Sequence, residues 1–412
     1  MPPIIRLLGV DRMLIQDRMT SRKAKEIYAS IRRQGTMSKL DLMQVSGLTG
    51  STLTRILEEL TTQGLLIDVG LGESTGGRRP ILYQTNPHYG YALGLDISRT
   101  YSKLVLTDLH LQKLQARTWT MDADMTPDRL IHEAARSALQ MIADQGIARE
   151  SVLGMGIGAV GPLDRLNGRL INPLGFPSAG WQGYEICNRM EEQLGLQTVL
   201  DNGANTAALG EYWLSTGEQL EHMLYLHVGV GIRTAMIVGG AIVYGAIDME
   251  GAIGQMIVQA DGLPSRHTSG NYGALESYAT TYAIEQAAKS HLKLGRASML
   301  RERVGQIEEL TYPMIESCLA EGDPLAQELF EQAASYFGIG LANLLNILHP
   351  QKVILGGPLI SGNEQFFQHA VDVAVQKMYA SHVYQVQFER SKLGDEAVMI
   401  GAAATLVNKL TD

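Results

Sequence analysis

The chain has only two cysteines among its 412 residues, Cys187 and Cys318. Two cysteines cannot build the disulfide framework of a small secreted domain, and they suit a reducing cytoplasm. The sequence also lacks an apolar run of membrane-spanning length. Its start, with Arg6 and Arg12 among apolar residues, is not a secretory signal. These absences predict a cytoplasmic protein without a membrane partner.

Basic residues are in excess only in the N-terminal part of the chain. Residues 1–82 hold 12 Lys/Arg and 8 Asp/Glu, a net charge of +4, whereas the rest holds 22 and 35, a net charge of −13. A basic head on an acidic body indicates that only the head meets a polyanion. Two ordinary domains with different surfaces are the alternative. A chain of this length is expected to form about two or three domains.

The head is predicted to contain three helices and a hairpin. Ser21 is a candidate N-cap for the first helix, a short helix covers 38–45, and the third runs from about 50 to 63. Helix, short helix, glycine-containing turn and helix is the helix-turn-helix arrangement, whose last helix enters the major groove. Residues 65–69 and 81–85 are expected to form a β-hairpin with a basic tip, which is a wing.

Polar and basic side chains of this head are the candidate DNA contacts. Small or polar residues in the first turn of the third helix can reach bases or phosphates, and arginines at the wing tip can reach phosphates. The predicted contacts are Lys39, Thr49, Ser51, Thr52, Arg55, Arg78 and Arg79. A small helical unit of this kind can also be a protein-interaction module, which is the alternative.

The Asn86-Pro87 pair marks the junction between the head and the body. The predicted domains are an N-terminal arm at 1–20, a winged helix-turn-helix domain at 21–88 and a body at 89–412. The arm is either a helix that docks on the body or an extension that lies on DNA, and the sequence leaves both open.

The body contains two similar strand-turn-strand segments. Residues 95–105 can be laid over 226–236, and each segment is an apolar strand, a tight turn and another strand. This weak internal repeat suits an α/β body with two similar lobes around a cleft. A chance likeness between two β-hairpins is the alternative.

The stretch from Leu200 to Glu211 joins an apolar strand to a helix-forming run, and such a corner commonly lines a ligand cleft. From Asn202 onward it resembles the N-D-A-N-x-A-A-L-G-E segment of the ROK family (repressors, open reading frames, kinases). The resemblance implies a two-lobed actin/sugar-kinase/Hsp70-like body behind the winged head. In the family's sugar kinases, an aspartate at the position of Gly203 takes the proton from the sugar hydroxyl. Glycine cannot do so, which predicts a body without a catalytic residue.

Other family motifs are altered as well. The first phosphate-binding turn of ROK kinases is Asp-x-Gly-Gly-Thr, and here Ser98 and Arg99 occupy the glycine positions. Small residues let backbone N–H groups approach phosphate, so ATP is not expected and no cofactor is predicted. The family's zinc loop holds three cysteines, whereas segment 267–276 holds none. His267 alone cannot bind zinc, so no metal site is predicted.

Four polar residues match the positions that hold sugar hydroxyls in the family. They are predicted to bind a ligand, and they are Asn172, Asn202, Gln255 and Glu276. Their amide and carboxylate groups can donate or accept hydrogen bonds. Asn172 stands before a proline, and a turn former is the alternative explanation for it, almost as good as ligand binding. For Glu276 the alternative is an acid that caps or flanks the start of a helix near residue 275.

The resemblance therefore implies a transcriptional regulator, a repressor of carbohydrate-related genes, that senses a sugar or sugar phosphate without phosphorylating it. Its expected partners are double-stranded operator DNA, the small-molecule effector and further copies in a homodimer or homotetramer. One alternative is a ROK sugar kinase with a DNA-binding head. Another is a regulator that needs no ligand and uses the body only for oligomerisation or protein partners.

Overall fold

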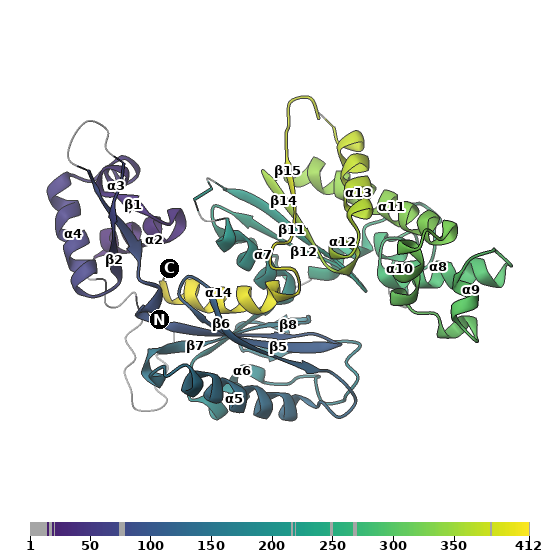
Figure 1. Ribbon diagram of the computed structural model, residues 1–412, viewed down its shortest axis with the longest axis horizontal. Coiled ribbons are helices and arrows are strands. Elements are labelled where there is room, and N and C mark those ends of the chain that lie inside the picture. The colour runs from purple at the N-terminus through teal and green to yellow at the C-terminus, as the bar shows by residue number, and fades with distance from the viewer. Residues whose placement is uncertain are drawn as a thin grey trace.

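A computed structural model of the chain describes residues 15, 19, 21–73, 79–215, 217–218, 220–247, 250–266, 270–379 and 381–411. Figure 1 shows a small head at one end, followed by two lobes that each contain a β-sheet. In the described part of the chain, no helix is long and apolar enough to cross a membrane.

The helices of the head begin at side-chain caps. Ser21 accepts a hydrogen bond from the backbone N–H of Ala24, and α2 (Arg22–Gln34) follows. Ser38 and Asp41 form a reciprocal capping box at α3 (Lys39–Ser46). Gly47, in the left-handed conformation, ends α3, and the third helix is α4 (Gly50–Thr62). The three predicted helices are confirmed. They could be predicted because each cap lies within a few residues of the helix that it delimits.

A three-stranded sheet completes the head. Its order is β1 (Met37–Ser38), β3 (Ile81–Thr85) and β2 (Leu66–Leu71), all antiparallel. The β2–β3 hairpin is the predicted wing, and its tip, residues 74–78, lies outside the described residues. The pairing of β1 with β3 was not predicted, because two residues are too short to show a strand pattern.

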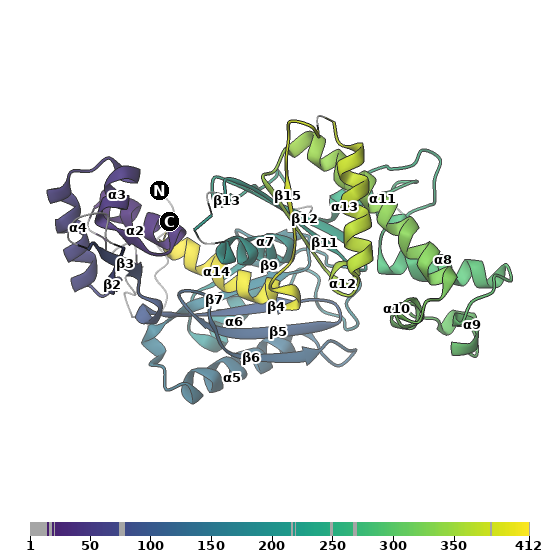
Figure 2. The same cartoon turned by 45° about the horizontal axis from the view of Figure 1, so that its top comes forward.

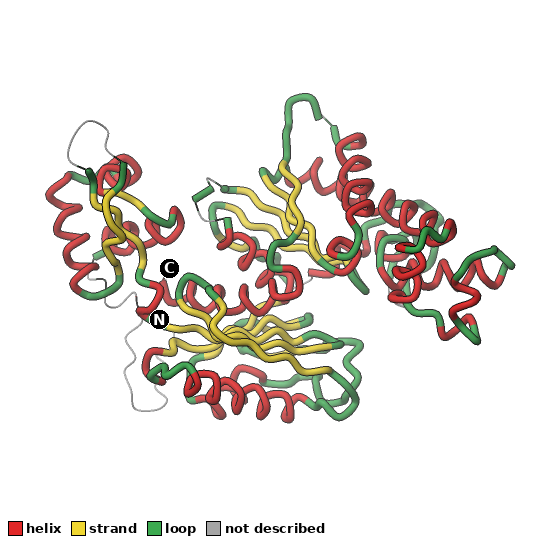
Figure 3. The backbone as a smooth tube through the Cα atoms, in the orientation of Figure 1, coloured by secondary structure: helices red, strands yellow, loops and turns green. Residues whose placement is uncertain are grey.

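Lobe 1 is a five-stranded mixed sheet with helices on both faces. The strand order is β10 (Thr198–Asn202), β7 (Val152–Ala159), β4 (Tyr91–Ile97), β5 (Tyr101–Asp108) and β6 (Lys113–Thr120). Helices α5 (Pro127–Asp144) and α6 (Ile186–Leu194) cover one face, as Figure 3 shows. The small pair β8 (Leu163–Asp164) and β9 (Arg169–Leu170) stands apart from the sheet.

Lobe 2 repeats this plan. Its strand order is β13 (Ala241–Ile242), β12 (Ile232–Val238), β11 (His222–Val228), β14 (Lys352–Gly356) and β15 (Gln387–Arg390). The hairpins β4–β5 and β11–β12 are therefore equivalent parts of two sheets, as the internal repeat predicts. The helices of this lobe are α8 (Thr281–Lys293), α9 (Leu300–Arg303), α10 (Tyr312–Ala320), α11 (Pro324–Leu348), α12 (Pro358–Ser361) and α13 (Glu364–Lys377).

One predicted helix of lobe 2 is shorter than expected. The sequence pattern favours a continuous helix over 275–294, but the structure has a single 3₁₀ turn at Leu275–Ser277 before α8 begins. Thr280 is the N-cap of α8, and its hydroxyl accepts a hydrogen bond from the backbone N–H of Ala283. A side-chain cap stops the helix from extending backwards, so Glu276 lies in the turn and does not cap α8.

Two helices lie together between the lobes. They are α7 (Gly203–Leu214) and α14 (Ala397–Thr411), and Figure 2 shows both between the two sheets. Glycine permits this close approach: a Cβ at Gly94 of β4 would lie 2.0 Å from the carbonyl oxygen of Met399, and one at Gly401 would lie 1.6 Å from that of Thr206. Small residues of α14, such as Gly401, therefore allow its close packing in this core.

Candidate functional site

The predicted recognition helix presents two exposed polar side chains on one face. Ser51 and Arg55 are exposed and lie four residues apart, so they project from the same side of α4. The hydroxyl of Thr49 caps α4 and contacts the hydroxyl of Thr52 at 2.9 Å. Ser51 and Arg55 are therefore accessible to a partner, and their contact with DNA stays a prediction, whereas Thr49 and half-buried Thr52 also form the start of the helix.

Two other predicted DNA contacts have partners inside the head. Nζ of Lys39 donates a hydrogen bond of 2.5 Å to the hydroxyl of Thr54. Nε of Arg79 donates one of 2.8 Å to the carbonyl oxygen of Gly72, which closes the base of the wing. Arg78 lies outside the described residues. A DNA-binding role for these three residues stays a prediction.

The corner between β10 and α7 is where the catalytic aspartate of the family's kinases would stand. Asn202 is the N-cap of α7, and its Oδ1 accepts a hydrogen bond of 2.8 Å from the backbone N–H of Asn205. A Cβ at Gly203 would lie 3.5 Å from Nη1 of Arg233, so a side chain would fit there but would meet a guanidinium. Asn202 thus has a structural role in addition to the predicted ligand contact.

A buried carboxylate at this corner was missed by the sequence reasoning. Asp201 accepts hydrogen bonds from the backbone N–H of Asn202 (2.7 Å), from Nδ2 of Asn205 (2.9 Å) and from the hydroxyl of Tyr244 (2.6 Å). Burial raises the pKa of Asp201, and these donors oppose the shift. The one available signal was an acidic residue directly before the family motif.

Tyr244 reaches this carboxylate from the other lobe. It follows β13 of lobe 2, whereas Asp201 is on β10 of lobe 1. The guanidinium of Arg165, in the β8–β9 turn, lies 3.6 Å from the centre of the Tyr244 ring. Asp201, Tyr244 and Arg165 therefore form a contact between the lobes, which we call the lobe latch.

Gln255 and Glu276, both predicted ligand residues, are brought together in lobe 2. Nε2 of Gln255 donates a hydrogen bond to Oε1 of Glu276, and the hydroxyl of Ser265 donates a second one at 3.2 Å. Oε1 of Gln255 accepts a hydrogen bond of 2.9 Å from the backbone N–H of Asn271, and its carbonyl oxygen accepts one of 2.9 Å from Nδ2 of Asn271. Gln255 therefore ties together the segments that zinc would hold in the family.

The loop that matches the family's zinc site is only partly described. His267 and Ser269 lie outside the described residues, and Ala274 is buried. Gly273 has φ +67°, and a Cβ there would lie 1.6 Å from the carbonyl oxygen of Gln259, so only glycine fits. Among the described residues, no cluster of three His, Cys, Asp or Glu side chains could hold a metal. The absence of zinc stays a prediction.

The position of the first phosphate turn holds a buried acid in a basic surrounding. Asp96 is 3% exposed, and its Oδ2 has no hydrogen-bond partner within the described chain. Burial raises the pKa of Asp96 to about 7, although the charges of Arg233 and Lys103 lower it. Nε of Arg99 donates a hydrogen bond of 2.7 Å to the carbonyl oxygen of Leu174. The arginine in the turn thus anchors a neighbouring loop.

That loop carries Asn172, the fourth predicted ligand residue. Asn172 is exposed, and no hydrogen bond joins it to the other three candidates in the part of the chain that the structure describes. Trp181, in the same loop, is buried: its Nε1 donates a hydrogen bond of 3.0 Å to Ser178, and its ring stacks on Phe176 at 4.4 Å. The loop is therefore held by core packing, and Asn172 is free to face solvent or ligand.

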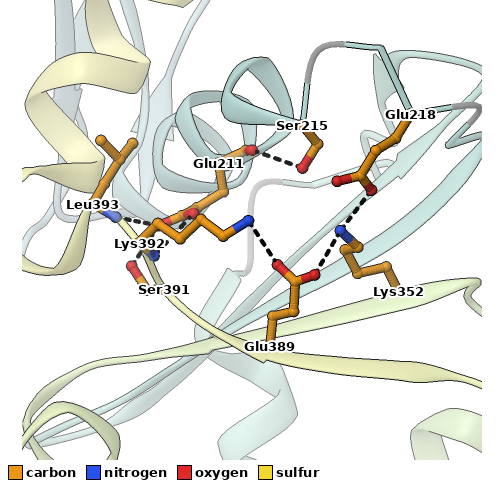
Figure 4. A network of polar contacts seen from close by, with 8 residues as sticks. All are labelled: Glu211, Ser215, Glu218, Lys352, Glu389, Ser391, Lys392 and Leu393. Carbon is orange, nitrogen blue, oxygen red and sulfur yellow. Dashed lines mark hydrogen bonds and ion pairs between the residues drawn. The ribbon is translucent and has the colours of Figure 1, made fainter.

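An open hollow of about 1030 Å³ lies elsewhere, along β14 and β15 of lobe 2. It is lined by Lys352, Glu218 and Glu389, and by glutamine side chains of the sheet edge. Lys352 is 1% exposed and forms ion pairs with Glu218 (2.6 Å) and Glu389 (2.9 Å) (Figure 4). None of the four predicted ligand residues lines this hollow.

Comparisons with known proteins agree over almost the whole chain. The putative xylose repressor of Caldicellulosiruptor sp. (strain Rt8B.4) is 27% identical over 384 residues, which are 93% of this chain and 95% of that protein. The DNA-binding transcriptional dual regulator NagC of Escherichia coli (strain K12) is 24% identical over 379 residues, 90% of this chain and 91% of that protein.

Solved structures share the fold. A ROK family transcriptional regulator, described as a homologue of the E. coli MLC protein, superposes with a TM-score of 0.76 at 22% identity, covering 96% of each chain. A ROK hexokinase from Thermus thermophilus superposes with a TM-score of 0.63 at 27% identity, covering 78% of this chain and 99% of the hexokinase. The model of the ROK family matches residues 92–409. The predicted resemblance is confirmed, and this chain belongs to the ROK family.

Proposed function

We propose that the protein is a transcriptional repressor of carbohydrate genes whose body binds a sugar without phosphorylating it. The observation that carries the proposal is coverage: the xylose repressor and NagC match more than nine-tenths of their own length to this chain, head included. Residues 21–88 form the DNA-binding unit, residues 89–412 form the body, and two heads of a homodimer or homotetramer meet a two-fold operator.

The proposed effector site lies at the lobe junction, on Asn172, Asn202, Gln255 and Glu276. A carboxylate accepts hydroxyl hydrogen bonds strongly, so Glu276 is the principal contact. Gln255 holds that carboxylate in place, and Asn202 offers its amide at the start of α7. D-Xylose and N-acetylglucosamine are the first probes, because the repressors that match this chain are named for these sugars.

Phosphoryl transfer is not part of the proposal. The position of the expected base is Gly203, and Arg233 lies next to it. General base catalysis typically contributes about 10²–10⁴-fold to a rate. Ser98 and Arg99 fill the positions where a phosphate-binding turn needs small residues. A Gly203→Asp variant is therefore expected to fold and still release no ADP in the presence of sugar.

The test combines DNA selection with a sugar panel. A random DNA pool is selected with the wild-type protein, and affinity for the winning fragment is measured with and without D-xylose, N-acetylglucosamine, glucose and their phosphates. The expected result is specific binding that one sugar changes. Glu276→Gln should keep DNA affinity and lose the sugar effect, whereas Glu331→Gln, an exposed acid on α11, should keep both.

Three results would contradict the proposal. Sugar-dependent ADP release by the wild type would favour the kinase alternative. DNA binding that no sugar alters, together with unchanged melting temperatures, would favour the regulator without a ligand. If no DNA sequence is selected, the proposed function as a repressor is itself contradicted.

A further inference from the structure

Arg32 of α2 joins the head to the body through several contacts. Its Nη2 donates a hydrogen bond of 2.8 Å to Oδ1 of Asn408, and its Nη1 donates one to the hydroxyl of Thr411. Its guanidinium carbon also lies 4.0 Å from the ring centre of Trp213. Asn408 and Thr411 are in the last turn of α14, and Trp213 is in the last turn of α7. A single half-buried arginine therefore holds the ends of both central helices.

Those two helices form one unit. Glu211 of α7 is 1% exposed and accepts hydrogen bonds from the hydroxyl of Ser391 and from the backbone N–H groups of Lys392 (3.2 Å) and Leu393 (3.0 Å) (Figure 4). These residues lead directly into α14. Because α7 and α14 also pack through glycine, a displacement of one helix is transmitted to the other.

The opposite end of α7 lies at the proposed effector site. Asn202 caps its first turn, and Asp201 of the lobe latch precedes it. A helix of 12 residues is about 18 Å long. Helix α7, which lies between the two sheets (Figures 1 and 2), therefore spans from the lobe junction to its last turn, where the ring of Trp213 contacts Arg32.

Lobe 2 reaches the same part of the head by separate contacts. The backbone N–H of Gly217, in the loop after α7, donates a hydrogen bond of 3.3 Å to the carbonyl oxygen of Arg33. The next residue, Glu218, pairs with buried Lys352 of β14. A Cβ at Gly240, in the β12–β13 turn, would lie 3.4 Å from Nη2 of Arg33. The last turn of α2 therefore contacts lobe 2 as well as the two central helices.

We infer that Arg32 is the positioning residue that couples the effector site to the DNA-binding head. A ligand changes DNA affinity only through its different affinity for two arrangements of the lobes. A change in lobe arrangement moves α7 and α14, and Arg32 carries that movement to α2. This inference rests on the proposed function, because it needs an effector at the lobe junction.

The test uses full-length Arg32→Ala with Arg22→Ala as a matched control. Both variants remove one positive charge from α2, but the side chain of Arg22 is 92% exposed, and within the described chain its ion pair is with nearby Glu26. The probe is whichever sugar of the panel raises the melting temperature of the wild type. In the wild type that sugar should change operator affinity by roughly 5- to 150-fold, the usual range for coupled sites. In Arg32→Ala the ratio of the operator affinities measured with and without sugar should fall towards one. The sugar should still raise the melting temperature of this variant.

Two further variants separate the loss of the Arg32 hydrogen bonds from the loss of its charge. Asn408→Ala removes one of the partners of Arg32 without changing charge, and it should reduce the ratio in part. Arg32→Lys keeps the charge but cannot bridge two acceptors with a planar fork, so it should rescue only partly. A full sugar effect in Arg32→Ala and in Asn408→Ala would overturn the inference.

A second readout does not depend on any sugar. Hydrogen exchange of the last turn of α14, residues 408–411, should speed up in Arg32→Ala and stay unchanged in Arg22→Ala. If no sugar affects the wild type, the sensing part of the proposed function fails. Hydrogen exchange alone then tests whether Arg32 stabilises the last turn of α14. Exchange that is identical in all three proteins would overturn the role of Arg32.

Discussion

The hydroxyl of Tyr244 donates a hydrogen bond of 2.6 Å to Oδ2 of Asp201, and this bond joins lobe 2 to lobe 1. The acceptor is 2% exposed, and the guanidinium of Arg165 covers the tyrosine ring from the lobe 1 side. A buried carboxylate is costly unless donors surround it. The lobe latch therefore stabilises the arrangement of the lobes that the structure shows.

Removing the hydroxyl should weaken that arrangement. Tyr244→Phe leaves Asp201 with two donors, Asn202 and Asn205, and should lower the free energy of unfolding by about 1.5–3 kcal/mol, the usual contribution of a hydrogen bond to a charged group. Tyr272→Phe, on a 67% exposed tyrosine of the same lobe, should change it by less than about 0.5 kcal/mol. Urea denaturation of both variants measures the difference, and equal losses would contradict the role of the latch.

The parts of the molecule that are encoded locally could be predicted from the sequence. Ser21 and the Gly47 turn lie within a few residues of the helices they delimit, so the head was recognisable. The two hairpins of the body were predicted for the same reason. The single helix over 275–294 was wrong because Thr280, which caps α8, is not distinguishable in sequence from other threonines.

The contacts at the lobe junction could not be predicted in the same way. Tyr244 and Asp201 are 43 residues apart, and Arg99 reaches Leu174 across 75 residues. No local pattern marks either pair. The family motif placed Gln255 and Glu276 in one site, but only the structure shows Gln255 bound to Asn271, where the family uses metal.

The buried acid of the first turn should make stability depend on pH. The folded-state pKa of Asp96 is about 7, above its ordinary value of 3.8, because burial disfavours the charged form. The folded state therefore binds more protons between about pH 4 and 7, and the contribution of Asp96 to stability is lost as pH rises through 7. Asp96→Asn stays neutral, so its melting temperature should rise relative to the wild type between pH 5 and 8.

The buried histidine His227 changes the pH dependence of stability in the opposite direction. The effect of Asp96 must therefore be measured as the difference between the wild type and Asp96→Asn. Burial and the charge of Arg233 lower the pKa of His227 to about 3, which makes stability increase with pH between about 3 and 6.5. His227 is present in both proteins, and its effect cancels in the difference between wild type and Asp96→Asn. Melting curves that stay parallel from pH 5 to 8 would contradict the shifted pKa of Asp96.

Gln255 should hold its loop without zinc. Gln255→Ala removes the side-chain hydrogen bonds to Glu276 and Asn271 and should cost about 1–3 kcal/mol, because the buried carboxylate of Glu276 loses one of its donors. Gln385→Ala, on an exposed glutamine, should cost less than about 0.5 kcal/mol. A chelator should leave the wild-type melting temperature unchanged. Stoichiometric zinc in elemental analysis of tag-free protein would refute this account of the loop.

The recognition helix and the wing should contribute to DNA binding in different ways. Arg55 is exposed one turn into α4, where a side chain can reach a base edge, so Arg55→Ala should cost about 1–3 kcal/mol on the selected operator and little on random DNA. Arg79 instead holds the base of the wing through Gly72. Replacing Arg78 and Arg79 together should weaken binding to most sequences.

Salt dependence separates these two contributions. Each phosphate contact that is lost lowers the slope of log affinity against log salt by about 0.9, because fewer counterions are released. The wing double variant should therefore flatten the slope, whereas Arg55→Ala should leave it nearly unchanged if Arg55 reads a base. Arg117→Ala, at an exposed position of β6 in the body, removes one positive charge outside the head and should change neither quantity. Equal effects of Arg55→Ala on operator and random DNA would show that Arg55 contacts phosphate and that specificity comes from other residues.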